Sequence, residues 1–130
     1  MIVLDASAAV DLLVEPAAQT GALRARLREA SIVYAPHLMD AEVTYALRRK
    51  VLQGRIDQLT ARRAIRRPGA MRLRLRPHRP LLGRAFALRH QVAAYDAIYV
   101  AMAEATGATL LTRDARLGRT TGHGARVEVV

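Results

Sequence analysis

Short apolar segments alternate with helix-patterned segments along the chain, and this alternation constrains the fold most. Short runs of apolar or alternating residues predict strands at residues 1–4, 31–35, 71–76, 109–112 and 126–130. Helical spacing predicts helices at residues 8–14, 18–29, 38–52, 58–67, 80–92, 96–106 and 115–119. Strands that alternate with helices form mainly parallel sheets. The sequence therefore predicts an α/β sandwich, in which helices cover both faces of a mainly parallel, twisted central sheet.

The size and composition of the chain are those of one globular domain. It has 130 residues, of which 52% are hydrophobic and 25% charged, so we expect residues 1–130 to form a single unit. Cysteine is absent, which excludes disulfides and thiolate metal sites. No uncharged run approaches the ~18 residues that span a bilayer, and the first basic residue is Arg24. We therefore expect a cytoplasmic protein without a secretory signal or a membrane partner.

Positive charge is concentrated in the middle of the chain. The sequence has 21 Lys and Arg against 11 Asp and Glu, a formal net charge of +10. Residues 48–89 contain 13 arginines and Lys50 but a single acid, Asp57. Such a cationic segment favours nucleic acid or an acidic protein as the partner. A well-solvated basic surface without a partner would explain the same charge.

The usual catalytic signatures are missing from the sequence. There is no glycine-rich phosphate loop and no Gly-x-Gly-x-x-Gly, and neither Ser7 nor Ser31 lies in a nucleophile elbow. The four histidines are scattered without zinc spacing. The carboxylates are therefore the remaining source of chemistry.

Two acids follow predicted strands. Asp5 comes directly after the first strand, and Asp114 comes just past the strand at residues 109–112. Open parallel sheets bind ligands outside the carboxyl ends of their strands, so both acids are expected at the edge that holds the site. Each acid also has the position of a helix N-cap, an alternative of at least equal weight for either residue alone.

Two further acids lie on apolar helices. Glu42 is centred on the apolar face of its helix, where an unpaired carboxylate is costly, and an ion pair with Arg49 is the structural alternative. Asp96 opens the most apolar helix of the chain and has no cation one turn away, although capping would also explain it. The predicted topology gathers all four acids, which capping does not explain.

Converging carboxylates need a counter-charge. Two carboxylates ~4 Å apart repel by about 4 kcal/mol at an effective dielectric near 20, so some would be protonated or a divalent cation would neutralise them. A site of oxygen ligands without His or Cys suits Mg²⁺ or Mn²⁺. Such a cation can activate a water and stabilise the leaving oxygen of a phosphodiester, while arginines hold the polyanionic backbone.

Three segments give the sequence a resemblance to a known family. They are MIVLDASAAVDLL at the start, PHLMDAEVTYAL around Glu42, and AAYDAIYVAMAEATGATLLTRDARL, which contains Asp96 and Asp114. In sequence and order they resemble the PIN-domain ribonucleases and, more narrowly, the VapC toxins of bacterial toxin–antitoxin pairs. The resemblance spans nearly the whole chain. Its C-terminal block is the most specific part, and the Arg-rich residues 62–80 match least.

The resemblance implies a PIN-like α/β/α sandwich and a Mg²⁺- or Mn²⁺-dependent endoribonuclease. Such an enzyme inhibits translation by cutting structured RNA, for example a tRNA or an rRNA loop. By this likeness four acids match the acidic quartet of the family: Asp5, Glu42, Asp96 and Asp114. Ser7 and Thr112 match the hydroxyl residues that accompany it. The resemblance also implies a cognate VapB-like antitoxin that blocks the site, and a toxin homodimer.

On this hypothesis Asp5, Asp96 and Asp114 hold the metal, and Glu42 orients or deprotonates the attacking water. Contacts to the RNA backbone are assigned, more weakly, to Arg72, Arg74, Arg76 and Arg79, which would otherwise be a solvated strand edge. Two other functions fit the same residues. One is a related metal-dependent nuclease that acts on DNA, and the other is a non-catalytic RNA-binding or adaptor domain whose acids are caps and ion pairs.

Overall fold

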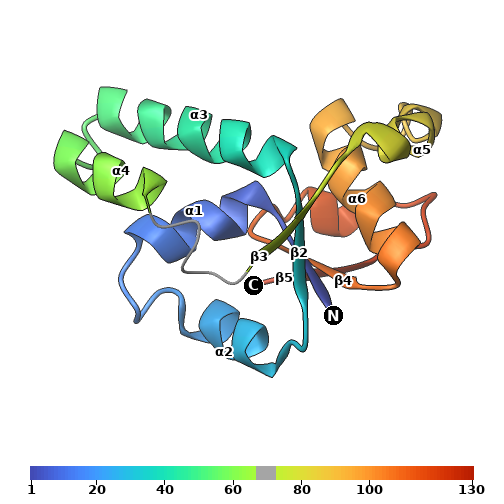
Figure 1. The fold of residues 1–130 in the computed structure, drawn as a ribbon, viewed down its shortest axis with the longest axis horizontal. Coiled ribbons are helices and arrows are strands. Elements are labelled where there is room, and N and C mark those ends of the chain that lie inside the picture. The colour runs from blue at the N-terminus through green and yellow to red at the C-terminus, as the bar shows by residue number, and fades with distance from the viewer. Residues whose placement is uncertain (67–72) are drawn as a thin grey trace.

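One parallel sheet organises the protein. The computed structural model describes residues 1–66 and 73–130 (Figure 1). Within these residues, five strands form a sheet in the order β3-β2-β1-β4-β5, and each neighbouring pair is parallel. Helices pack against the sheet to complete the layers. The predicted α/β/α sandwich is therefore confirmed.

The strands are short, and the central ones are the most apolar. β1 (Ile2–Leu4) lies between β2 (Val33–Pro36) and β4 (Thr109–Thr112), while β3 (Leu73–Arg76) and β5 (Arg126–Val129) form the two edges. Every residue of β1 and β2 is buried. Strands that are covered on both faces need such continuous apolar sequences.

Six α-helices connect the strands in the described part of the chain: α1 (Ala6–Val14), α2 (Gly21–Glu29), α3 (Leu38–Leu52), α4 (Gln58–Ile65), α5 (Leu82–Ala87) and α6 (Ala94–Thr106). α1, α3 and α4 pack together at one end of the molecule, and α5 packs against α6 at the other (Figure 1). Within the described ranges, no helix has the length and apolarity needed to cross a bilayer.

Helix α6 is the core helix of the fold. Its residues 97–103 are all buried, and the helix packs across β1, β2 and β4. Gly107 ends it with a left-handed backbone, φ 65°, as expected for a glycine C-cap. Because residues 97–103 are buried, the helix itself has a fixed position relative to the sheet.

Some boundaries differ from the prediction near proline. The helix expected from residue 18 begins at Gly21, because residues 16–20 form hydrogen-bonded turns. Strand β2 was expected to stop before Pro36, but it includes this residue, which pairs in register with Arg76 of the edge strand β3.

The helix expected over residues 80–92 is also shorter. A 3₁₀ turn at Arg79–Leu81 precedes α5, and α5 ends at Ala87 because the amides of Arg89 and Gln91 donate to carbonyls three residues back. The helix expected at residues 115–119 is a 3₁₀ turn, Leu117–Arg119. Residues 67–72, which hold Arg72 and the start of a predicted strand, lie outside the described residues.

Candidate active site

The carboxyl ends of β1 and β4 place predicted site residues side by side. The two strands pair so that Leu4 lies opposite Leu111, and the Asp5 N–H donates to the Leu111 carbonyl at 3.0 Å. Asp5 and Thr112 each follow one of these paired leucines. Asp5 is 6% exposed and Thr112 is fully buried, so both side chains have fixed surroundings.

Two hydroxyls bind the carboxylate of Asp5. Its Oδ2 accepts a hydrogen bond from Thr112 Oγ1 at 2.8 Å and another from Ser7 Oγ. The Ser7 N–H also points to Oδ2 at 3.3 Å, so Asp5 is the N-cap of α1, as the capping alternative proposed. Oδ1 accepts no hydrogen bond from the part of the chain that the structure describes. The cap therefore uses only one oxygen and leaves the other for a ligand.

Asp114 is held by its own loop. Its N–H donates to Thr112 Oγ1 at 3.0 Å, and its carboxylate accepts the Arg116 N–H at 2.7 Å. The Arg116 guanidinium lies 3.0 Å from Oδ2, and this contact lowers the pKa of Asp114. The N-cap role proposed for Asp114 is not formed, because the 3₁₀ turn that replaces the predicted helix has Arg116 at its N-cap position and the Asp114 side chain accepts the amide two residues on. The predicted place of Asp114 beyond the end of β4 is confirmed.

Glu42 lies in the second turn of α3. Its Oε2 accepts a hydrogen bond from Tyr99 Oη at 2.6 Å. The ion pair with Arg49 that would have explained Glu42 structurally is not formed among the described residues. The Arg49 guanidinium lies over the ring of Tyr45 instead, 5.9 Å from its centroid. The ion-pair alternative is therefore wrong.

Burial and nearby charges perturb Glu42. Burial raises its pKa most, the hydrogen bond from Tyr99 opposes this rise, and the charges of Asp5 and Asp96 add to it. A carboxylate whose pKa is raised is a stronger base than that of an ordinary surface glutamate.

Asp96 lies in the first turn of α6. The N-cap of this helix is Ala93, and no side chain caps its first amides, so the capping alternative for Asp96 is wrong. Burial raises the pKa of Asp96 most, and the charges of Asp5 and Asp114 raise it further, while Arg116 lowers it. These effects place Asp96 within electrostatic reach of two other predicted acids.

The four acids therefore form one electrostatic group. Asp5 raises the pKa of both Glu42 and Asp96, and Asp114 raises that of Asp96. In residues 1–66 and 73–130, however, no three Asp, Glu or His side chains lie in an arrangement that could hold a metal ion. Three of the four bind protein partners: Asp5 binds hydroxyls, Glu42 binds the Tyr99 hydroxyl, and Asp114 binds a guanidinium.

The chemistry of the donor set fits a hard divalent cation. The available ligands are carboxylates and hydroxyls, which Mg²⁺ and Mn²⁺ prefer. Burial raises the pKa of Glu42 and of Asp96 most, and the negative charge of Asp5 adds to the rise at both, which a bound cation would counter.

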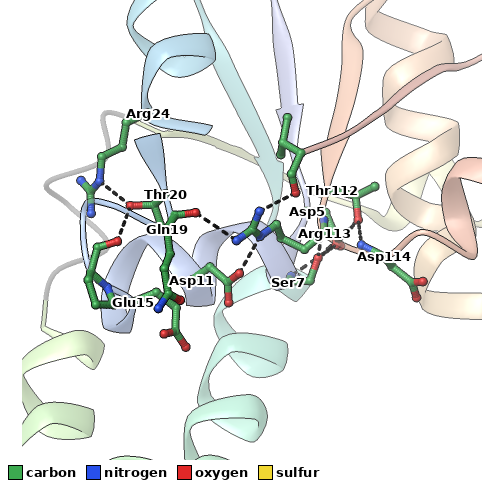
Figure 2. A network of polar contacts seen from close by, with 12 residues as sticks. Asp5, Ser7, Asp11, Glu15, Gln19, Thr20, Arg24, Thr112, Arg113 and Asp114 are labelled. Atoms are coloured by element: carbon green, nitrogen blue, oxygen red, sulfur yellow. Dashed lines mark hydrogen bonds and ion pairs between the residues drawn. The ribbon is translucent and has the colours of Figure 1, made fainter. Parts of the chain in front are cut away.

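Arg113 is a structural residue that the sequence analysis missed. Its backbone N–H donates to Ser7 Oγ at 3.1 Å (Figure 2). Its guanidinium joins three other segments through Asp11 Oδ2 at 2.6 Å, the Val130 carbonyl at 2.6 Å and the Gln19 carbonyl at 3.3 Å. Arg113 thereby anchors the loop that carries Asp114. Its position between Thr112 and Asp114 was the only signal in the sequence.

Three of the predicted backbone-contact arginines lie on or just after the edge strand β3 in the described residues. Arg74 and Arg76 are exposed on edge strand β3, and Arg79 follows in the 3₁₀ turn. Because β3 is parallel to β2, its carboxyl end points to the same side as the ends of β1 and β4. The Arg76 guanidinium lies 5.6 Å from the centroid of the Tyr34 ring.

The fold and the acidic edge of its sheet define a small parallel α/β protein with a carboxylate-rich site. Comparison with known families identifies this class, because the model of the PIN domain family matches residues 2–122. The chain belongs to the PIN-domain family, and the resemblance to VapC ribonucleases is confirmed by its relatives.

Two relatives from Mycobacterium tuberculosis cover nearly the whole chain. Ribonuclease VapC1 is 43% identical over 129 residues, which is 98% of this chain and 96% of the relative. Ribonuclease VapC12 is 38% identical over 130 residues, covering 100% of this chain and 99% of the relative. The crystal structure of VapBC2 from Rickettsia felis, bound to a DNA fragment from their promoter, has a TM-score of 0.67. It covers 99% of this chain and 98% of that chain at 16% identity, so it supports the fold alone.

Proposed function

We propose that this chain is the toxin of a toxin–antitoxin pair, an endoribonuclease that requires Mg²⁺ or Mn²⁺. The observation that carries the proposal is the electrostatic coupling of Asp5, Glu42, Asp96 and Asp114 at the carboxyl edge of the sheet. The identity of 43% to a VapC ribonuclease supports RNA as the substrate.

The metal would be held by Asp5, Asp96 and Asp114. Asp5 Oδ1 accepts no hydrogen bond from the described residues, and the hydroxyls on Oδ2 keep the side chain in place. When bound, the cation supplies Lewis acidity to the phosphodiester and to its attacking water. Asp114 would exchange its contact with Arg116 for this role, and the pair is exposed enough for that exchange to cost little.

Glu42 is the proposed general base. Its raised pKa favours transfer of a proton from the attacking water to the carboxylate. Water oxygen then bonds to phosphorus as the bond from phosphorus to the 3′ oxygen breaks. The departing 3′ oxygen takes a proton from solvent water and Glu42 returns its proton to solvent, so the products carry a 5′-phosphate and a 3′-hydroxyl. The ribose 2′-hydroxyl takes no part in this route.

The substrate proposed is structured RNA, such as a tRNA or an rRNA loop. The net charge of +10 supports a polyanionic partner, and guanidinium groups suit phosphate contacts. Arg74, Arg76 and Arg79 are the described candidates for backbone contact.

The biological setting follows from the same family. We propose that residues 1–130 act as one domain in the cytoplasm, as a homodimer, with a VapB-like antitoxin as partner. The similarity to Ribonucleases VapC1 and VapC12 supports the antitoxin as partner. The basic surface also suits an acidic protein.

Cleavage assays with purified protein test this function. We expect Mg²⁺ or Mn²⁺ to support cutting of structured RNA, EDTA to abolish it, and Asp96→Asn to lower kcat/KM by about 100-fold or more. Asp40→Asn is the matched control, because Asp40 is an exposed acid of α3 and should leave the rate unchanged. Undiminished cutting by Asp96→Asn, or in EDTA, would refute the mechanism.

The same assay separates the alternatives. Preferential cutting of DNA would indicate the DNA nuclease. A non-catalytic RNA-binding domain would bind RNA without cutting it, and Asp96→Asn would then change only the stability of the fold.

A further inference from the structure

Tyr99 is a buried polar group that the proposed mechanism leaves without a tested role. It lies one turn after Asp96 in α6, its side chain is 0% exposed, and Oη donates to Glu42 Oε2 at 2.6 Å. Among the side-chain contacts of the described residues, this is the one hydrogen bond that either group makes. The contact joins two helices across 57 positions of sequence.

Packing alone does not account for the hydroxyl. The neighbours of Tyr99 along α6 are apolar and buried, so a phenylalanine would fill the same space without carrying a polar atom into the core. A buried hydroxyl is tolerated because it has a partner, and that partner is Glu42. Burial and the neighbouring carboxylate raise the pKa of Tyr99, so its hydroxyl stays protonated and remains a donor.

The two ends of this hydrogen bond differ in freedom. Tyr99 belongs to helix α6, which packs across β1, β2 and β4, and its side chain is buried. Its ring therefore cannot move without disturbing the core. Glu42 is half-buried and has a longer, more flexible side chain. The hydrogen bond holds one carboxylate oxygen of Glu42, while the other accepts none from residues in the described ranges. Since Asp96 and Tyr99 share a rigid helix, α6 also sets the position of the Glu42 carboxylate relative to Asp96.

We propose that Tyr99 is a positioning residue, which fixes the Glu42 carboxylate so that its free oxygen is presented to the attacking water. This inference rests on the proposed function, in which Glu42 is the general base. Tyr99 acts through Glu42 and does not touch the substrate. Its loss should therefore lower kcat and leave KM for RNA unchanged.

Tyr99→Phe tests the proposal because it removes only the hydroxyl. We expect kcat for RNA cleavage to fall about tenfold, the effect of losing one hydrogen bond to a charged group, with KM and metal-free RNA affinity unchanged. Tyr34→Phe is the matched control. Tyr34 is a core tyrosine of β2, 9% exposed, and no hydrogen bond to its hydroxyl occurs in the described chain, so this variant should keep full activity.

A double-mutant cycle with Glu42→Gln distinguishes positioning from a general effect on the fold. If Tyr99 acts through Glu42, Tyr99→Phe should cause no further loss in the Glu42→Gln background. A structural role would instead produce the same loss in both backgrounds, and that additive result would overturn the inference.

NMR titration of Glu42 in the metal-free protein gives a readout that is independent of activity. We expect Tyr99→Phe to raise the pKa of Glu42, because the hydrogen bond from Tyr99 lowers it, whereas Tyr34→Phe should leave it unchanged. A Tyr99→Phe variant with wild-type kcat, or with an unchanged titration of Glu42, would overturn the role proposed for Tyr99 and leave the proposed function intact. A wild-type protein that cuts no RNA would overturn the proposed function and the inference with it.

Discussion

The hydroxyl of Thr112 connects two of the site acids and offers a direct measure of how the site is built. Thr112 is fully buried at the end of β4. Its Oγ1 donates to Asp5 Oδ2 at 2.8 Å and accepts the Asp114 N–H at 3.0 Å. The Thr112 side chain therefore links the carboxyl end of β1 to the loop after β4.

Thr112→Val removes both contacts while keeping nearly the same shape. A hydrogen bond to a carboxylate contributes about 1.5–3 kcal/mol, and leaving a partly buried N–H without a partner adds about 1 kcal/mol or more. We therefore expect the free energy of unfolding to fall by about 2–4 kcal/mol. For a chain of 130 residues this corresponds to a decrease in Tm of roughly 10 °C.

Urea unfolding at neutral pH in EDTA measures this loss without a metal contribution. Thr112→Ser keeps the hydroxyl and should recover most of the stability. Thr44→Val is the control, because the exposed Thr44 hydroxyl donates to the Asp40 carbonyl of the same helix, α3. It should change stability by less than about 0.5 kcal/mol. The reasoning would be refuted if Thr112→Val were as stable as the wild type, or if Thr112→Ser were equally destabilised.

Two further predictions concern charge. Hydrogen bonds from Arg84 and from the Gly124 N–H hold the pKa of Glu104 at about 2, below its ordinary 4.5. Because the folded-state pKa is depressed, this stabilisation is present above about pH 4.5 and is lost as the pH falls toward 2. In urea unfolding across this range, the deficit of Glu104→Gln should shrink as the pH falls, and a constant deficit would contradict the assignment. Arg116→Gln removes a cation that competes for Asp114, so the Kd for Mn²⁺ measured by calorimetry should decrease by up to about fivefold. Unchanged or weaker Mn²⁺ binding would show that the ion pair does not compete.

Most of the fold was predictable because its signals are local. The period of two in strands and the helical spacing of apolar residues depend only on neighbours in the sequence, so all five described strands lie within a residue or two of their predicted positions. The differences fall where local signals compete, as in residues 80–92, where a 3₁₀ turn and a short helix replace one longer helix.

The placement of the acids was predictable in part. Asp5 and Asp114 follow strands, and parallel strands end at the same edge of a sheet, so their common location follows from topology. Whether each acid also serves as a cap was not decided by the sequence. The structure confirms the N-cap role for Asp5 and excludes it for Asp114 and Asp96.

The amino-acid order by itself determined which segments are strands and helices, where acids follow them, and that the middle of the chain is cationic. Only the tertiary structure decided the partners of two of the acids, Tyr99 for Glu42 and Thr112 for Asp5. These two contacts join residues 57 and 107 positions apart. Such contacts depend on strand register and on how α3 and α6 pack against the sheet, and no periodic pattern within one segment encodes them.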